Sequence, residues 1–175
     1  MSDSSTTLPQ RVSSDPSVST RQAIVTAWLL CGVLDITAAC LQAWIQAGRL
    51  PGDVLRGVAS ALWGRAALNA GAGMATIGLA MHFAVALTAT MIFYALSRRI
   101  PYLRSAPIWI IGPLYGIVVF CAMNYGTLPA LSWLRSLYLD TPPRWPGPMS
   151  WPQLAIHMIA VGSPIAWGVR RAPVA

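Results

Sequence analysis

The sequence predicts an all-α, polytopic membrane protein: a four-transmembrane-helix bundle with two short interfacial helices. Composition is the first reason, because 55% of the 175 residues are hydrophobic, only 10% are charged and the mean hydropathy is +0.56. A soluble domain carries about 25% charged residues. Spacing is the second reason, because four apolar stretches are each long enough to cross ~30 Å of hydrocarbon as a helix. These expected spans cover approximately residues 22–46, 74–96, 107–125 and 152–169.

The two ends of the chain differ from its centre. Residues 1–20 are rich in serine, threonine, aspartate and proline and contain almost no large apolar side chain. Such a segment cannot bury enough apolar surface to offset the entropy lost on folding. We therefore expect a disordered polar tail at residues 1–20, one transmembrane domain at residues 21–171 and a short tail at residues 172–175.

The first span carries an aspartate near its middle. Asp35 belongs to a set of small and polar residues that recur every three or four positions and therefore share one helical face. An ionised carboxylate is costly in hydrocarbon, so such residues usually turn toward the bundle interior and find partners there. The face expected to point inward comprises Cys31, Gly32, Asp35, Ala39, Gln42 and Gln46.

The two long connections between spans each contain a helix too short to cross the membrane. In the first, Pro51-Gly52 breaks the chain and Asp53 is suited to cap an amphipathic helix that runs to residue 63. We expect this helix at the membrane interface or re-entering the bundle. In the second connection, residues 129–139 are expected to form an interfacial helix, and the prolines that follow keep residues 142–148 extended.

The later spans supply candidate partners for Asp35. His82 lies within a stripe of small residues in the second span, and small residues favour close helix packing, so His82 should point inward. Asn124 and Tyr125 are expected at the far end of the third span. His157 shares one face of the fourth span with Gln153.

Two prolines are expected to kink the spans that contain them. Pro113 follows Gly112 within the third span, and Pro164 lies within the fourth. Each removes a backbone donor from the helix interior, which is a common cause of helix kinks.

The arginines predict the orientation. All twelve basic residues are arginine, and short loops that carry basic residues tend to remain cytoplasmic. With both termini inside, seven arginines lie on the inner side and five on the outer side, so we expect an N-in, C-in topology. At ~1.5 Å per residue, His82, Asn124 and His157 then lie roughly 4 to 12 Å below the outer ends of their spans, in the outer half of the membrane, and form a polar column that descends toward Asp35 at about 17 Å. The expected buried cluster is Asp35, His82, Asn124 and His157, with Gln42, Tyr125 and Gln153 as secondary members.

Several short motifs carry a resemblance to a known family over most of the chain after residue 21. They are VASALWG at 58–64, GLAMHF at 78–83, RRIP at 98–101, YG at 115–116, MNY at 123–125, and His157 with VGSPI at 161–165. These motifs resemble the YagU-type family of small bacterial inner-membrane proteins of unknown function. The resemblance implies a four-helix protein of the bacterial inner (cytoplasmic) membrane. It implies no activity, cofactor or site residues.

Each polar residue in the spans has a structural and a functional interpretation. Asp35 is either a proton-carrying or ion-binding carboxylate or a hydrogen-bond partner that fixes helix packing. His82 and His157 are either packing residues or proton relays. We predict no cofactor, although the two histidines are weak candidates for ligands of a haem or, with Asp35, of a metal ion.

The sequence leaves three function classes open. The leading hypothesis is a non-enzymatic inner-membrane protein with a proton- or pH-linked role in the envelope or as an accessory of a larger complex. The alternatives are a small proton-coupled transporter that acts as a homodimer, and a haem- or metal-bearing redox subunit. An enzyme has no support, because the common catalytic motifs and any glutamate are missing. The arginines flank apolar segments, so the expected partner is the lipid bilayer and not nucleic acid.

Overall fold

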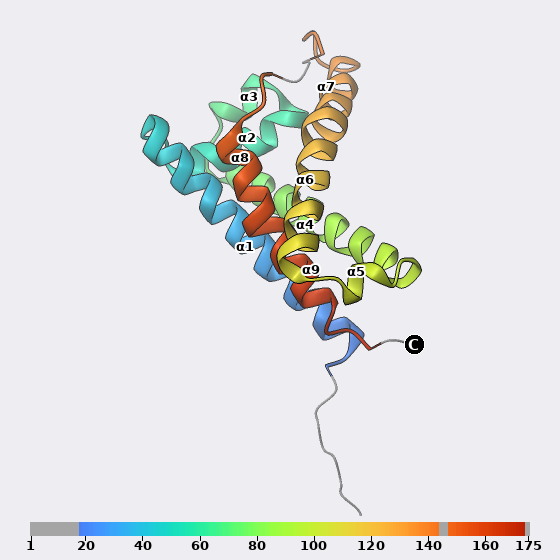
Figure 1. The fold of residues 1–175 in the computed structure, drawn as a ribbon. Coiled ribbons are helices and arrows are strands. Elements are labelled where there is room, and N and C mark those ends of the chain that lie inside the picture. Colours follow the sequence, from blue (N-terminus) through green and yellow to red (C-terminus); the bar gives the residue numbers. More distant parts are fainter. Residues whose placement is uncertain (1–17, 144–146, 174–175) are drawn as a thin grey trace, which may run out of the picture.

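A computed structural model of the chain describes residues 18–143 and 147–173, so most of the expected tails at residues 1–20 and 172–175 lies outside the described residues. All regular elements within the described ranges are helices, and none is a strand. This confirms the all-α prediction. Figure 1 shows the helices packed lengthwise and obliquely against one another.

The first long helix, α1, covers Thr20–Ala47 and matches the first expected span. It begins with a capping box, in which the Ser19 hydroxyl accepts from the Gln22 N–H and the Gln22 side chain accepts from the Ser19 N–H. It ends at Gly48, whose φ of 61° is the left-handed conformation typical of a glycine C-cap. This sharp end turns the chain back toward the bundle.

The next two long helices also lie where spans were expected, and the second of them extends well beyond the expected end of its span. Helix α4 covers Ala72–Arg99. A continuous helix of 29 residues, Ile108–Ser136, follows and consists of α6 (Ile108–Cys121), η1 (Ala122–Thr127) and α7 (Leu128–Ser136). With α1, these are three helices in the described ranges that are long and apolar enough to cross a membrane. They indicate a multi-pass membrane protein.

The end of the third span is a correction to the sequence analysis. We expected the span to end near residue 125 and a separate interfacial helix at 129–139, but the helix continues without a break to Ser136. Asn124 therefore lies inside a long helix and not at its end. The π-helical segment η1 ends two residues before Pro129, and the wider π turn accommodates the proline, which lacks an N–H and crowds the carbonyl four residues back.

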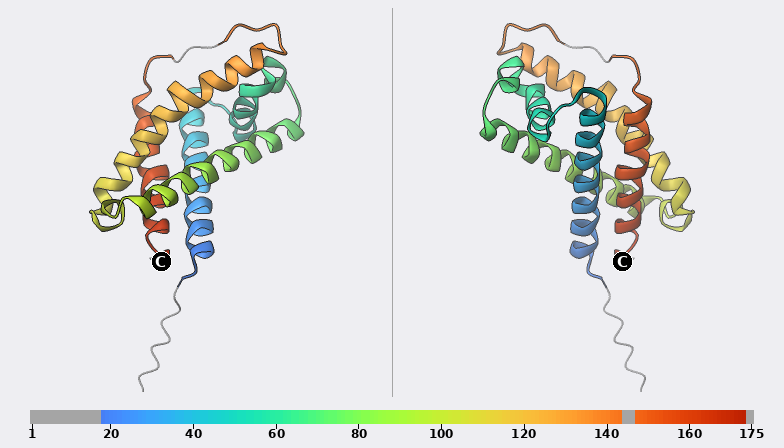
Figure 2. Two further views of the ribbon diagram at one scale, coloured as in Figure 1. Left: turned by 90° about the vertical axis from the view of Figure 1, so that its right-hand side faces the viewer. Right: turned by 90° about the vertical axis from the view of Figure 1, so that its left-hand side faces the viewer.

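The fourth expected span shows the same arrangement. It consists of α8 (Trp151–Ile156), the π-helical segment η2 (His157–Gly162) and α9 (Ser163–Val169). Here too the π segment ends two residues before a proline, Pro164. This segment is not among the three helices that meet the length and hydropathy criteria for a span. The beginning of α1 and the end of α9 lie at the same end of the molecule (Figure 2).

Three short helices complete the described part of the chain: α2 (Pro51–Trp63), α3 (Arg65–Leu68) and α5 (Tyr102–Ser105). Helix α2 is the expected short helix, and it packs closely against α4. Asp53 is not the N-cap residue, because the helix begins earlier and Leu50 occupies that position. The Asp53 carboxylate instead accepts from the Leu50 N–H at 3.0 Å, and this bond, together with Arg56, lowers the pKa of Asp53.

Glycines set how closely the helices approach. A Cβ on Gly78 of α4 would lie 1.9 Å from the Leu55 carbonyl oxygen of α2, and a Cβ on Gly162 would lie 1.9 Å from the Gly112 carbonyl oxygen of α6. Both contacts are backbone to backbone, as expected where small residues replace the hydrophobic effect in membrane packing. The largest fully buried side chains in the described ranges are Phe93, Phe120, Ile165 and Val169.

Candidate functional site

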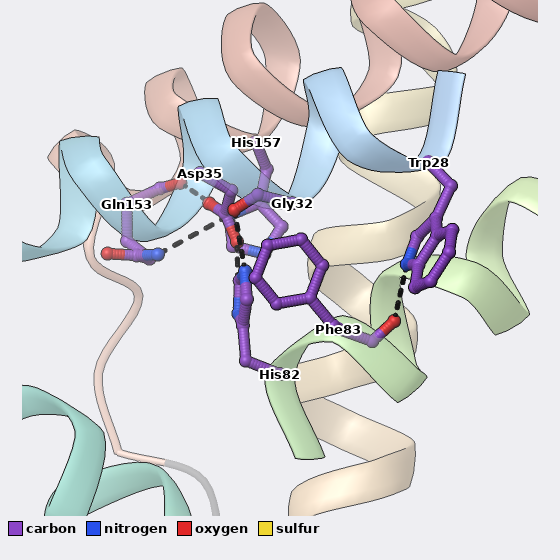
Figure 3. Close-up of polar contacts among 7 residues, drawn as sticks. All are labelled: Trp28, Gly32, Asp35, His82, Phe83, Gln153 and His157. Carbon is purple, nitrogen blue, oxygen red and sulfur yellow. Dashed lines mark hydrogen bonds and ion pairs between the residues drawn. The ribbon is translucent and has the colours of Figure 1, made fainter. Parts of the chain in front are cut away.

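A cavity of about 650 Å³ lies between α1, α2, α4, the α6–α7 helix and the α8–η2 segment. Most of its wall is apolar. Five of the seven residues that the sequence analysis singled out line it: Asp35, His82, Asn124, Gln153 and His157. Figure 3 shows four of them, with Asp35 on α1 facing His82 on α4. The arrangement brings together residues from helices that are distant in the sequence.

The central contact joins Asp35 and His82. The Asp35 Oδ2 lies 3.9 Å from the His82 Nδ1, and the two side chains are only 16% and 11% exposed. The other carboxylate oxygen, Oδ1, is buried and has no hydrogen-bond partner among the described residues. A buried carboxylate oxygen without a donor is costly, so this atom requires a proton, a water molecule or a ligand.

The second ring nitrogen of His82 fixes how the pair is protonated. His82 Nε2 lies 2.9 Å from the carbonyl oxygen of Gly32 (Figure 3). A carbonyl only accepts, so we assign the hydrogen to Nε2. In neutral His82, the bare Nδ1 then faces the carboxylate of Asp35, and two acceptors repel each other. The repulsion disappears when one proton is added, either to Nδ1 or to the carboxyl group. Protonation of either group therefore changes this contact from repulsive to attractive.

Close packing of α1 on α4 produces this contact. A Cβ on Gly32 would lie 2.4 Å from the ring of Phe83, so only glycine permits the approach without a shift of that ring. Trp28 Nε1 donates to the carbonyl of Phe83 at 2.8 Å, one turn away (Figure 3). These contacts hold Gly32 against α4 and place its carbonyl within reach of His82.

His157 and Asn124 are satisfied by their own helices. His157 is 7% exposed, and its Nδ1 lies 2.9 Å from the Gln153 carbonyl, so we assign the hydrogen to Nδ1. The Gln153 side chain is farther from the same nitrogen, at 3.5 Å. Asn124 donates to the carbonyl of Phe120 at 2.9 Å. Both residues lie in π-helical segments, which are frequent at functional sites.

A second cavity, of about 380 Å³, adjoins the first near the ends of α1 and α2. It is lined by Gln42, Gln46, Arg49 and Asp53, and the two cavities share Arg49 and Gln153 in their walls. The Gln42 Oε1 is buried without a partner among the described residues. The second cavity therefore places polar side chains next to the cavity that contains Asp35. Tyr125 is 54% exposed and lines neither cavity.

The sequence analysis missed Arg49 as a site residue. It was counted among the arginines that indicate topology, because it follows the end of the first span. The left-handed cap at Gly48 turns the chain so that Arg49 lines both cavities. The sequence signal was present in the pair Gly48-Arg49, since glycine after a helix indicates a sharp turn.

The described residues contain no group of three or more histidine, cysteine, aspartate or glutamate side chains that could hold a metal ion. The described residues thus offer no set of metal ligands around His82 and His157. Whether these histidines bind a haem or a metal ion stays a prediction. The chain matches no protein-family model, no curated protein and no solved structure. The functional argument therefore depends on the Asp35–His82 pair and the cavity around it.

Proposed function

We propose that this chain is a non-enzymatic, multi-pass protein of a bacterial inner membrane that binds and releases one proton at the Asp35–His82 pair. The observation that carries the proposal is the facing of two acceptors, Asp35 Oδ2 and His82 Nδ1, at 3.9 Å while Nε2 is committed to the Gly32 carbonyl. A proton on either group removes the repulsion between them. The pair lies in a cavity that shares wall residues with a second, more polar cavity, and this polar lining supports exchange of the proton.

The charged and titratable groups around the pair come from four directions. Cys31 lies one turn before Asp35 on α1, and His157 faces the cavity from η2. Arg49 lines the cavity from the connection after α1. The α6–α7 helix contributes Asn124, which does not titrate. Arg49 is the permanently charged cation among these groups, and His82 faces the Asp35 carboxylate from the α4 side.

The topology proposal has four crossings, with Trp151–Val169 as the fourth and both termini in the cytoplasm. The shared location of the start of α1 and the end of α9 supports an even number of crossings (Figure 2). The resemblance to the YagU-type family supports the bacterial inner membrane. Reporter fusions after residue 175 and within residues 140–148 provide the test. A cytoplasmic reporter should be active only at the first site and a periplasmic reporter only at the second.

A proton site in a cavity is compatible with two roles. A pH-linked accessory or envelope role needs only proton binding that alters the packing of α1 on α4. Proton-coupled transport of a small molecule, by a homodimer, needs the cavity to take a ligand as well. The cavity around Asp35 has a volume of about 650 Å³ and a mostly apolar wall. Small-molecule sites occupy roughly 300–1,000 Å³ and are mostly apolar with a few polar groups, so the cavity supports the transport role.

Infrared difference spectroscopy on the full chain in nanodiscs tests the proton site. As pH rises and the imidazolium of His82 loses its proton, the carboxylate bands of Asp35 should shift in the wild type, and Asp35→Asn should lack this change. Asp140→Asn, a carboxylate in the connection after α7, is the matched control and should retain it. An unchanged band in Asp35→Asn would contradict the assignment.

Proteoliposomes that contain a pH-sensitive dye separate the two roles. Substrate-driven proton movement that is lost in Asp35→Asn and retained in Asp140→Asn supports transport. Proton binding in the infrared experiment without any proton movement across the membrane supports the accessory role.

A further inference from the structure

Arg135 is a buried arginine at the end of α7, away from the Asp35 cavity. Its residue is only 4% exposed. Its guanidinium donates to the Ser60 carbonyl at 3.1 Å, to the Thr141 hydroxyl at 3.3 Å and to the Ser132 hydroxyl at 3.4 Å. All three acceptors are neutral. A guanidinium carries five N–H donors, so these bonds leave some of its hydrogen-bonding capacity for another group.

The positive charge of Arg135 has no carboxylate within ion-pair distance in the described ranges. There, the ion pairs are Arg56 with Asp53 and His82 with Asp35. Arginine is almost never fully buried unless it is paired, because removing a charge from water costs far more than neutral hydrogen bonds recover. The burial of Arg135 therefore indicates an anion that the described residues do not supply at this position.

A pocket beside Arg135 fits a small anion. It has a volume of about 230 Å³, and its polar walls are Arg135, Arg65 and the hydroxyl-bearing residues Ser60 and Thr141. None of its described lining residues is acidic. The volume is below the roughly 300 Å³ at which sites for drug-sized molecules begin. Two arginines, with the Thr141 hydroxyl beside them, are groups that recognise phosphate.

The backbone is shaped to admit the arginine. Gly64 lies between α2 and α3 with a φ of 63°, a conformation that side chains rarely adopt. A Cβ at this position would lie 3.5 Å from the Arg135 Cδ and 3.3 Å from a methyl carbon of Leu139. Tyr138 also donates its hydroxyl to the Leu62 carbonyl, which joins the end of α7 to the end of α2. Both contacts hold the pocket walls together.

The pocket lies at the level where lipid headgroups are expected. It is at the end of the molecule opposite the last turn of α9, where α3 and the end of α7 meet (Figure 2). Three exposed aromatic side chains, Trp63, Trp133 and Tyr138, belong to the same helix ends. Tryptophan and tyrosine gather at membrane–water interfaces, and lipid phosphate groups lie at the same depth.

We propose that this pocket binds one phosphate group, with Arg135 as the buried charge and Arg65 as the second ligand at its rim. The group belongs either to an anionic phospholipid or to a free phosphate anion, since both present the same oxygens. The site is independent of the Asp35–His82 pair and does not rest on the proton-binding proposal.

The test measures the thermal unfolding of the full chain in a maltoside detergent and phosphate-free buffer. One arm adds inorganic phosphate, and the other adds mixed micelles that contain phosphatidylglycerol. Sodium chloride at matched ionic strength and diacylglycerol are the respective controls. We expect a higher Tm with one or both phosphate sources relative to its control. A rise with lipid alone assigns the site to a headgroup, and a rise with inorganic phosphate assigns it to the free anion.

Variants locate the effect. Arg65→Gln removes a charge without disturbing a buried residue and should raise the concentration needed for half-maximal stabilisation about tenfold, the effect of losing one charge-assisted contact. Arg99→Gln, an exposed arginine at the end of α4, is the matched control and should respond as the wild type. Arg135→Gln should abolish the response, and if it fails to fold, Arg65→Gln still decides. The proposal is overturned if neither source raises Tm, or if Arg65→Gln and Arg99→Gln respond alike.

Discussion

A double-mutant cycle at Asp35 and His82 probes the proton-sharing geometry most directly. Two unit charges separated by the observed 3.9 Å attract by about 4 kcal/mol at an effective dielectric constant of ~20. The side chains retain 16% and 11% of their exposure, so water screens part of this attraction. We expect a coupling energy of about 2 to 4 kcal/mol between Asp35→Asn and His82→Gln while the pair is protonated.

The pH dependence of the coupling has a definite sign. The coupling requires the shared proton, because neutral His82 presents a bare Nδ1 to the carboxylate. It should be greatest at the pH where the pair holds one proton, as imidazolium and carboxylate, and should fall as rising pH removes that proton or as acid adds a second one to the carboxylate. Asp35→Asn by itself should be tolerated at high pH, because the amide can donate to the bare Nδ1.

The assay is equilibrium unfolding in mixed micelles of maltoside and dodecyl sulfate, followed by circular dichroism. A second cycle, between Asp35→Asn and His157→Gln, is the control, since His157 bonds to Gln153 of its own helix segment. In this control cycle, the changes in unfolding free energy of the two single variants should add within about 0.5 kcal/mol. The reasoning is refuted if the Asp35–His82 energies are also additive within that margin at all pH values.

Two further predictions concern packing and capping. Gly78→Ala should destabilise the protein by about 1 to 3 kcal/mol or more, because the added Cβ would lie 1.9 Å from the Leu55 carbonyl oxygen. Gly73→Ala on the same helix has open space around it and should be neutral or stabilise the protein by up to about 1 kcal/mol. The same unfolding assay compares the two variants, and equal effects would contradict the packing argument. The lowered pKa of Asp53 means that its contribution to the start of α2 is present at neutral pH and is lost as pH falls through the acid range. Amide hydrogen exchange at residues 54–57 should therefore accelerate on acidification in the wild type, while Asp53→Asn should exchange faster already at neutral pH and show a smaller change.

The sequence by itself determined the helices and the polar face of the first span. Apolar stretches of sufficient length must satisfy their backbone groups internally, which leaves the helix as the local solution. The ends of α1 followed from local chemistry as well, because Ser19 and Gln22 form its capping box and Gly48 its left-handed cap. The face that carries Asp35 followed from helical periodicity.

Sequence reasoning failed where local signals conflicted with the longer helix. Pro129 indicated a helix start, yet the chain continues as a helix from Ile108 to Ser136 because the π-helical segment before it absorbs the missing donor. A π turn has no sequence period that a pattern can detect, since it widens the helix by one residue only locally. Asn124 was consequently placed at a helix end, although it lies well within the helix.

The contacts within the site were decided only by the tertiary structure. Which atom of His82 faces Asp35 depends on the rotation of α1 against α4, and that rotation follows from the close approach at Gly32 and the bond from Trp28 to the Phe83 carbonyl. The burial of Arg135 depends on α7 continuing as far as α2. Such contacts join residues 50 or more positions apart in the sequence, and no local pattern specifies the distance between two helices. The sequence thus determined which residues were polar and where each helix would form, while packing decided which of them meet.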